Sequence, residues 1–347
     1  MLTPLEFLYK GVWRLWDTGY RVGLFPTRKV LSKVISVGNL TWGGSGKTPT
    51  VEYLARGMEK RGNKIALLSR GYGSPQDRQK ADEVQWLIRR LGDIPVFANP
   101  DRISSARKAE ELGCQFLILD DGFQHRRLGR QLDLVTIDAT DPFGNGHLIP
   151  TGKLREPVQS LKRADWIILT KTDLVNDGEL SRIKEKIQKI VPDIPISETI
   201  YRPVGFAVID SQRDGDCPQK AGTVPISGLK DQNIGLVAAI GNPEAFKRTV
   251  EKLGARVTQT YFKRDHANYS AADFQEMEQI QKKNSIFCWV TTSKDAVKMR
   301  QVKIRDGSYF FNGSVSEKIR TVPIYELEIE LVFKEGEREL WQAIESL

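Results

Sequence analysis

The sequence predicts an α/β protein with a mostly parallel, doubly wound sheet, and two observations support this fold class. Short apolar runs rich in β-branched residues alternate with segments of helical periodicity over most of the chain. A glycine-rich loop, GGSGKT at 43–48, stands between one such run at 34–37 and a helical segment at 50–61. Strand, glycine loop and helix in this order open a nucleotide-binding α/β fold, so we expect a P-loop NTPase core.

The chain begins with a predicted amphipathic helix at 5–20. Apolar and aromatic residues recur there at helical spacing: Leu5, Leu8, Tyr9, Val12, Trp13 and Trp16. Aromatic side chains beside basic ones suit a helix that lies in a lipid headgroup layer, and packing on its own domain is the alternative. Charged residues interrupt the apolar segment that a signal peptide needs, so we do not expect a cleaved leader.

Alternating elements continue along the chain. Further strands are expected at 64–69, 94–98, 115–119, 132–137 and 166–169, with helices at 81–91 and 102–112. Polar, proline-containing sequence at 192–230 favours a domain boundary. Beyond it, strands are expected at 234–240, 256–261 and 286–291, with helices at 243–253 and 271–283. We therefore predict a core at 1–200, a second, smaller α/β domain at 201–330, and a C-terminal helix within 331–347 that packs back on the core.

The composition is that of an ordinary globular protein. Hydrophobic residues make up 40% and charged residues 28% of 347, which argues against disorder and against a polytopic membrane protein. No apolar run reaches the roughly 18 residues of a membrane-spanning helix. Three widely spaced cysteines argue against a disulfide framework or a zinc knuckle and suit a reducing cytosol. The net charge of +8 suits a polyanionic partner, such as nucleic acid, a phosphorylated metabolite or an anionic membrane. The alternative is that the basic residues form a solvated surface with no partner.

The loop at 43–48 has the residue types that hold phosphate. We expect its four small residues to turn backbone N–H groups toward phosphate oxygens: Gly43, Gly44, Ser45 and Gly46. Lys47 would reach the β- and γ-phosphates of a bound nucleotide, and Thr48 would ligate Mg²⁺. Thr41 stands where the generic pattern has its first glycine, so the strict motif is missed by one residue.

The strand expected at 115–119 ends in two adjacent acidic residues, Asp120 and Asp121. A P-loop enzyme needs a carboxylate at the end of a neighbouring strand to hold Mg²⁺. Two adjacent buried acids are costly unless a cation or hydrogen bonds compensate their charge. Asp120 and Asp121 are therefore candidate metal ligands, and a turn with capping aspartates is the alternative.

Several longer motifs follow one another along the chain. They are SVGNLT at 36–41, LSRGYG at 68–73, LDDGFQHR at 119–126, FGNG at 143–146, LREP at 154–157, Asp265-His266 and TTSKD at 291–295. Together they resemble the tetraacyldisaccharide 4′-kinases, the lipid A 4′-kinases of outer-membrane biogenesis, over most of residues 1–300. DDGFQH and LREP are far more specific than the phosphate loop, and they carry the resemblance.

The resemblance implies transfer of the γ-phosphoryl group of ATP, with Mg²⁺, to the 4′-hydroxyl of a tetraacylated glucosamine disaccharide 1-phosphate. The product would be lipid IVA, made by a peripheral, monotopic enzyme at the cytoplasmic face of the inner membrane. Such enzymes have a P-loop core, a smaller α/β domain on a two-stranded linker, and an N-terminal helix that engages the membrane. The basic excess would then face an anionic donor, acceptor and lipid surface, and no nucleic-acid partner is expected.

The resemblance also implies roles for single residues. Asp82 would act as the base toward the acceptor hydroxyl, with His266 of the second domain orienting it or relaying its proton. Lys47 and Arg155 would stabilise the transferred phosphoryl group. The metal shell would be drawn from Thr48, Glu83, Asp120, Asp121 and Glu156. Contacts with the acceptor would come from Asn39, Arg102 and His125, and a structural hydrogen bond beneath the Asp120-Asp121 turn is the alternative for His125.

Two departures from the family pattern stand next to these residues. Ala81 replaces the glycine that the family has before its acidic pair, and Lys263-Arg264 precede Asp265-His266 where the family usually has a proline. The second departure bears on how the loop presents His266. Neither departure removes a reacting group.

Other classes of function are open at this point. Thr170-Lys171-Thr172-Asp173 resembles the guanine-reading Asn-Lys-x-Asp tetrad of GTPases, with Thr170 in place of the asparagine. A membrane-associated nucleotide-binding scaffold would keep Lys47 and Thr48 but would not need Asp82 or His266. A soluble sugar kinase would not need the helix at 5–20.

Overall fold

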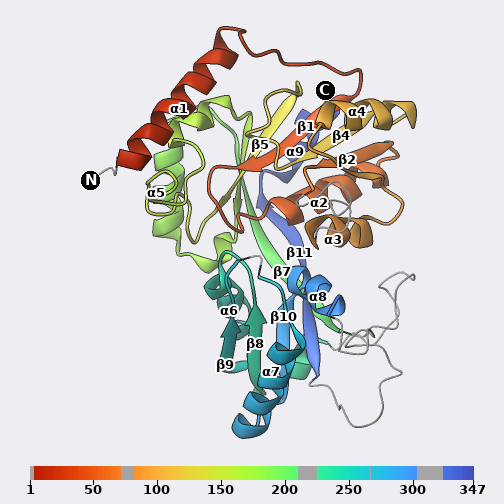
Figure 1. Ribbon diagram of the computed structural model, residues 1–347, viewed down its shortest axis with the longest axis vertical. Coiled ribbons are helices and arrows are strands. Elements are labelled where there is room, and N and C mark those ends of the chain that lie inside the picture. The colour runs from red at the N-terminus through yellow and green to blue at the C-terminus, as the bar shows by residue number, and fades with distance from the viewer. Residues whose placement is uncertain (1–3, 72–81, 210–224, 266, 303–322) are drawn as a thin grey trace. The chain divides into compact units, whose positions relative to one another are not determined.

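The computed structural model describes residues 4–71, 82–209, 225–265, 267–302 and 323–347, and of residues 82 and 83 the backbone alone. The chain divides into two compact units. A core unit comprises Met1–Tyr201 and Leu331–Leu347, and a smaller unit comprises Arg202–Glu330. The chain passes between the two units along strands β7 (Ile196–Val208) and β11 (Ile324–Glu335) (Figure 1).

The sheet of the core unit has the strand order β3-β2-β4-β1-β5-β6-β7. Its other strands are β1 (Lys33–Asn39), β2 (Ile65–Ser69), β3 (Val96–Ala98), β4 (Phe116–Asp120), β5 (Leu132–Asp138) and β6 (Trp166–Thr170). Every neighbouring pair in this order is parallel. The predicted mostly parallel α/β fold is therefore confirmed.

Parallel pairing brings the carboxyl ends of the central strands to one edge of the sheet. Val37 of β1 is level with Asp120 of β4, and Asn39 is level with Thr136 of β5. Asp138 of β5 is in turn level with Thr170 of β6. Polar residues that are far apart in the sequence consequently gather at this edge, which is where open α/β sheets bind their ligands.

The helices of the core unit are α1 (Pro4–Arg21), α2 (Lys47–Lys60), α3 (Asp82–Leu91), α4 (Arg102–Glu111), α5 (Asp177–Gln188) and α9 (Glu337–Glu345) (Figure 1). Helix α5 was not predicted, although a capping box formed by Asn176 and Glu179 marks its start. Helix α9 packs against α2, because Trp341 donates a hydrogen bond to Tyr53 Oη (3.1 Å). The guanidinium of Arg61 also lies 3.7 Å from the centre of the Trp341 ring.

The smaller unit has its own parallel sheet, in which β11 is followed by β10 (Cys288–Thr292), β8 (Asn233–Ala238) and β9 (Arg256–Phe262). Its helices are α6 (Pro243–Glu251), α7 (Ala271–Asn284) and α8 (Ser293–Arg300). The TTSKD motif forms the end of β10 and the start of α8, where the Thr292 side chain accepts the N–H of Asp295. Neither α8 nor β7 was predicted, and β7 lies within the stretch at 192–230 that suggested a boundary.

Candidate active site

The phosphate-binding loop joins β1 to α2 and has the backbone shape that its glycines allow. Gly43 and Gly46 have φ angles of 122° and 88°, and Lys47 is the first residue of α2. A Cβ atom at Gly46 would lie 2.5 Å from Tyr201 Oη and 2.7 Å from Thr170 Cγ2, so no larger residue fits. The loop therefore leads directly into a helix N-terminus, where unsatisfied N–H groups favour an anion.

Lys47, Asp121 and Arg155 form a charged cluster beside this loop. Arg155 binds the Asp121 carboxylate with two nitrogens, at 2.7 Å to Oδ1 and 3.0 Å to Oδ2. Lys47 Nζ lies 3.6 Å from Oδ1 of the same carboxylate. The cluster thus joins the phosphate loop, the DDGFQH turn after β4, and the LREP segment, three motifs that the sequence separates by up to 108 residues (Lys47 to Arg155).

The two cations determine the charge of Asp121. Burial by itself raises the pKa of this carboxyl, but the charges of Lys47 and Arg155, with a smaller contribution from Arg102, hold it well below its usual range. Asp121 also has a φ angle of 52°, a backbone conformation that non-glycine residues rarely adopt. Asp121 thus combines a rarely adopted backbone conformation with a bidentate ion pair to Arg155.

Asn39, the last residue of β1, contacts both cations of this cluster. Its side-chain oxygen accepts hydrogen bonds from Lys47 Nζ (3.1 Å) and from Arg155 (3.4 Å). Its amide nitrogen donates to the Thr41 carbonyl at 2.6 Å, and its own carbonyl accepts from Gln124 at 2.9 Å. Asn39 is fully buried. Besides the Thr41 carbonyl, the side chain thus contacts the two cations of the cluster, and the contact of Asn39 with the acceptor stays a prediction.

Three other predicted metal ligands are buried, and two of them lie at the ends of their elements. Thr48 is in the first turn of α2 and Asp120 is the last residue of β4, and both are buried. Ser69 Oγ lies 3.4 Å from one oxygen of Asp120. Glu156 is 1% exposed and forms an ion pair with Arg163 at 2.8 Å, while its Oε1 has no hydrogen-bond partner among the described residues. A buried carboxylate oxygen without a partner suits a cation or a donor supplied by a ligand.

These residues fit Mg²⁺ without forming a protein-only cage. Within the described part of the chain, no group of three or more His, Cys, Asp or Glu side chains is arranged to hold a metal ion. Mg²⁺ usually takes one or two protein oxygens and completes its shell with water and substrate phosphates. The Thr48 hydroxyl and the Asp120 carboxylate are oxygen ligands of that kind, whereas both oxygens of Asp121 are already bound by Arg155.

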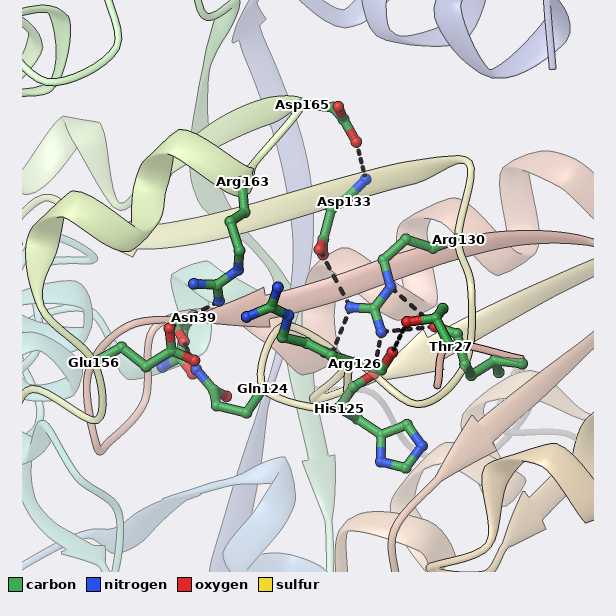
Figure 2. Close-up of polar contacts among 12 residues, drawn as sticks. Thr27, Asn39, Gln124, His125, Arg126, Arg130, Asp133, Glu156, Arg163 and Asp165 are labelled. Atoms are coloured by element: carbon green, nitrogen blue, oxygen red, sulfur yellow. Dashed lines mark hydrogen bonds and ion pairs between the residues drawn. The ribbon is translucent and has the colours of Figure 1, made fainter. Parts of the chain in front are cut away.

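The DDGFQH turn is held by Arg130, as Figure 2 shows. Arg130 donates to the carbonyls of Gly122 and Leu128, both at 2.9 Å, and pairs with Asp133 at 3.2 Å. It also donates to the His125 carbonyl. The His125 ring itself is half-buried, and its Nε2 has no hydrogen-bond partner among the described residues. For His125, the contact with the acceptor and the structural hydrogen bond both stay predictions.

Basic neighbours keep His125 neutral. Burial, followed by the charges of Arg102, Arg130 and Arg127, lowers the pKa of His125 to about 4. Arg102 is in the first turn of α4 and is 3% exposed. At neutral pH the ring is thus an uncharged hydrogen-bonding group in a basic region, which suits contact with an anionic ligand.

Helix α1 contacts the LREP segment, a connection that the sequence did not suggest. Tyr9 Oη donates to the Arg155 carbonyl at 2.7 Å. Burial and the nearby Glu156 charge raise the pKa of Tyr9, so the hydroxyl keeps its proton. Asp17 pairs with Arg126 at 2.7 Å and lies 3.9 Å from Arg163, which holds Glu156. Arg126, Arg163 and Glu156 lie close together in Figure 2.

Not all predicted site residues fall within what the structure describes. Asp82 is the first residue of α3, but its side chain, that of Glu83, and all of His266 lie outside the described residues. Among the rest, Lys47 and Arg155 each contact both Asn39 and Asp121. Sequence reasoning missed the supporting role of four residues: Tyr9, Asp17, Arg130 and Arg163. The run of basic residues after DDGFQH, which includes Arg130, was a sequence signal for the role of Arg130. No sequence signal indicated the contacts of α1.

The chain is similar to one family along its whole length. The family described as Tetraacyldisaccharide-1-P 4'-kinase matches residues 1–346. The tetraacyldisaccharide 4'-kinase of Halothermothrix orenii is 33% identical over 328 residues, which cover 88% of this chain and 84% of that protein. The tetraacyldisaccharide 4'-kinase of Bdellovibrio bacteriovorus is 34% identical over 316 residues, with 87% and 89% covered.

A solved structure agrees with the sequence comparisons. The crystal structure of an "apo" form of LpxK from Aquifex aeolicus in complex with ATP superimposes with a TM-score of 0.69 at 26% sequence identity. The similarity covers 99% of this chain and 97% of that chain. The fold that positions the site is therefore shared with a protein that binds ATP.

The low pKa of His125 predicts how stability depends on pH. The folded state disfavours protonation of the ring, so between pH 6.5 and 4 the unfolded state binds more protons and the free energy of unfolding decreases as the pH is lowered. After a discount for solvent screening, this contribution is about 1–2 kcal/mol. Urea unfolding at pH 7 and pH 4.5 should show the loss in the wild type and a smaller loss in His125→Gln. Equal losses in both proteins would contradict the assignment.

Proposed function

Because this chain belongs to the tetraacyldisaccharide-1-P 4'-kinase family, we propose that it phosphorylates the 4′-hydroxyl of a tetraacylated glucosamine disaccharide 1-phosphate. ATP supplies the γ-phosphoryl group, and the product, lipid IVA, is an intermediate of lipid A biosynthesis. The observation that carries the proposal is the charged cluster of Lys47, Asp121 and Arg155 beside the phosphate loop. GTPase activity and a non-catalytic scaffold account for neither the LREP segment nor the family match.

Phosphoryl transfer asks a protein mainly for positioning and for stabilisation of charge. The loop amides and Lys47 would hold the β- and γ-phosphates of ATP, since the loop ends at the N-terminus of α2. Arg155, oriented by Asp121 and Asn39, would stabilise the charge that spreads over the transferred group. Thr48 and Asp120 would hold Mg²⁺, which neutralises charge on the phosphates when bound, and Glu83 and Glu156 are further candidates.

The acceptor hydroxyl needs a base, and the match to the family motif favours Asp82 for this role. Asp82 begins α3. We assign His266 to the orientation of this base or to the relay of its proton, also from the family motif. Arg102 and His125 would contact the acceptor, because both belong to the basic region beside the site.

We further propose that α1 attaches the enzyme peripherally to the cytoplasmic face of the inner membrane. Apolar side chains of α1 are exposed instead of buried: Leu5, Phe7, Leu8, Val12 and Leu15. Its buried residues include two acids, Glu6 and Asp17, which bind the core unit. None of the helices in the described ranges is both long and apolar enough to cross a bilayer. An exposed apolar face on a helix held by its polar residues suits the surface of a lipid layer.

The kinase reaction tests the proposed function directly. Transfer of ³²P from γ-labelled ATP to detergent-dispersed tetraacyldisaccharide 1-phosphate should occur with the wild type. Asp82→Asn should lower the rate at least about 10²-fold, because an amide accepts no proton from the acceptor hydroxyl.

A matched control distinguishes loss of the catalytic base from loss of an acidic residue at the start of a helix. Asp177→Asn removes an exposed acid from the first turn of α5 and should leave the rate unchanged. Labelled lipid from Asp82→Asn at the wild-type rate would remove Asp82 as the base. No labelled lipid from folded wild type that binds ATP would refute the kinase assignment.

The membrane assignment has its own test. Replacement of Leu8 and Leu15 by serine should weaken partitioning into phosphatidylethanolamine–phosphatidylglycerol vesicles about tenfold or more, since apolar area drives interfacial binding. Sedimentation with vesicles measures the bound fraction. Leu112→Ser, at an exposed leucine after α4, should have no effect. Equal partitioning of the double variant and the wild type would exclude α1 as the attachment site.

A further inference from the structure

The tetrad at 170–173 remains without a role in the proposed reaction. It follows β6 directly, and Thr170, the last residue of that strand, is fully buried. Lys171 is also buried and has a φ angle of 58°, in the left-handed region that lysine rarely adopts. A strained backbone and a buried ammonium are both costly, and Lys171 has both, which points to a specific task for this corner of the sheet.

Both side chains contact the backbone of the phosphate loop. Lys171 Nζ donates to the Gly44 carbonyl at 3.1 Å. Thr170 Oγ1 lies 3.1 Å from the Ser45 carbonyl and 3.4 Å from the Ile137 carbonyl, and it donates to the nearer oxygen. Two consecutive carbonyls of the loop are thus bound by two consecutive residues of the tetrad. The methyl group of Thr170 also closes the space beside Gly46.

The ammonium of Lys171 is already neutralised by a buried acid. It forms an ion pair with Asp138, the last residue of β5, and both side chains are less than 10% exposed. Asp138 is itself held by the N–H of Thr140 (2.9 Å) and by its hydroxyl (2.7 Å). A buried pair of this kind contributes little net stability but defines geometry. The ammonium of Lys171 thus pairs with Asp138 at the end of β5, whereas Lys47 is the first residue of α2.

We propose that Thr170 and Lys171 are positioning residues that hold the phosphate loop in its anion-binding shape. The inference rests on the proposed function only in taking this loop as the ATP site. A trans peptide unit points its C=O and N–H in opposite directions. Fixing the Ser45 carbonyl on Thr170 therefore directs the Gly46 N–H to the opposite side. Lys171 fixes the Gly44 carbonyl, and the N–H of the same peptide unit, that of Ser45, donates within the loop to the Gly43 carbonyl at 3.0 Å. The Gly46 N–H is thus oriented before phosphate arrives.

Two other roles for the tetrad make different predictions. A lysine that touches phosphate would add a charge contact, so its loss would make ATP affinity less dependent on ionic strength. A tetrad that reads a base would change ATP and GTP affinity unequally. Positioning of the loop predicts an equal loss for ATP and GTP, with the dependence on salt unchanged, because Asp138 already neutralises the ammonium.

The experiment is equilibrium binding of ATP and GTP to the full-length protein by calorimetry, with no lipid acceptor present. Thr170→Val keeps the methyl group beside Gly46 and removes the hydroxyl, so both nucleotides should bind about fivefold more weakly. Thr170→Ser keeps the hydroxyl and should restore most of the affinity. Because the readout is binding, failure of the kinase assignment does not affect it.

A second set of variants tests Lys171. Lys171→Met combined with Asp138→Asn avoids an unpaired buried charge and should weaken both nucleotides about tenfold or more at every salt concentration. Lys184→Met is the matched control. Lys184 of α5 also pairs with a buried acid, Glu198 of β7, and both residues follow the tetrad in the sequence. This variant should bind ATP as the wild type does.

The results that would overturn the proposal are specific. Wild-type affinity in Thr170→Val and in the Lys171→Met/Asp138→Asn variant would show that the loop holds its shape without the tetrad. A shallower salt dependence in the lysine variant would assign Lys171 to direct phosphate contact. A loss confined to one nucleotide would assign the tetrad to the base. Failure of Thr170→Ser to restore binding would reduce Thr170 to a packing role.

Discussion

The site depends on one electrostatic constraint: the Asp121 carboxylate, buried after β4, has to be balanced by cations from other segments. Lys47 and Arg155 supply this balance, and Asn39 accepts a hydrogen bond from each of them. An unbalanced buried charge would cost several kcal/mol, so the phosphate loop, the DDGFQH turn and the LREP segment are held together. The specific motifs of the sequence thus meet in one cluster.

The same cluster is reached from the N-terminal helix. Tyr9 of α1 binds the Arg155 carbonyl, and Asp17 binds Arg126 beside the Arg163–Glu156 pair. A helix that leaves apolar side chains exposed is therefore in direct contact with the segment that carries Arg155. Thr170 and Lys171 hold two carbonyls of the phosphate loop. The LREP segment and the phosphate loop are thus each held by polar contacts with other segments of the core unit.

Local patterns were enough to predict the fold and the phosphate loop. The strand, glycine loop and helix around Lys47 are contiguous, and β4 and β6 are apolar except for their last residue. The pairing of Asp121 with Arg155 was not predictable from spacing, because the strand order brings the two segments together. Lys171 was interpreted by analogy with a base-reading tetrad, whereas its hydrogen bond to the Gly44 carbonyl shows that its side chain turns toward the loop. The roles of Asp82, Glu83 and His266 stay predictions from the family motifs.

The most direct test of the account is a double-mutant cycle between Asp121 and Arg155, measured as kcat/KM for phosphorylation of the lipid acceptor. Asp121→Asn, Arg155→Gln and the double variant would each be compared with the wild type. If the two residues act as one unit, the loss of kcat/KM in the double variant will be smaller than the product of the two single losses by a factor of about ten or more. This factor corresponds to a coupling energy of about 1.4 kcal/mol. Additive losses, within about 0.5 kcal/mol, would contradict the view that this pairing organises the site.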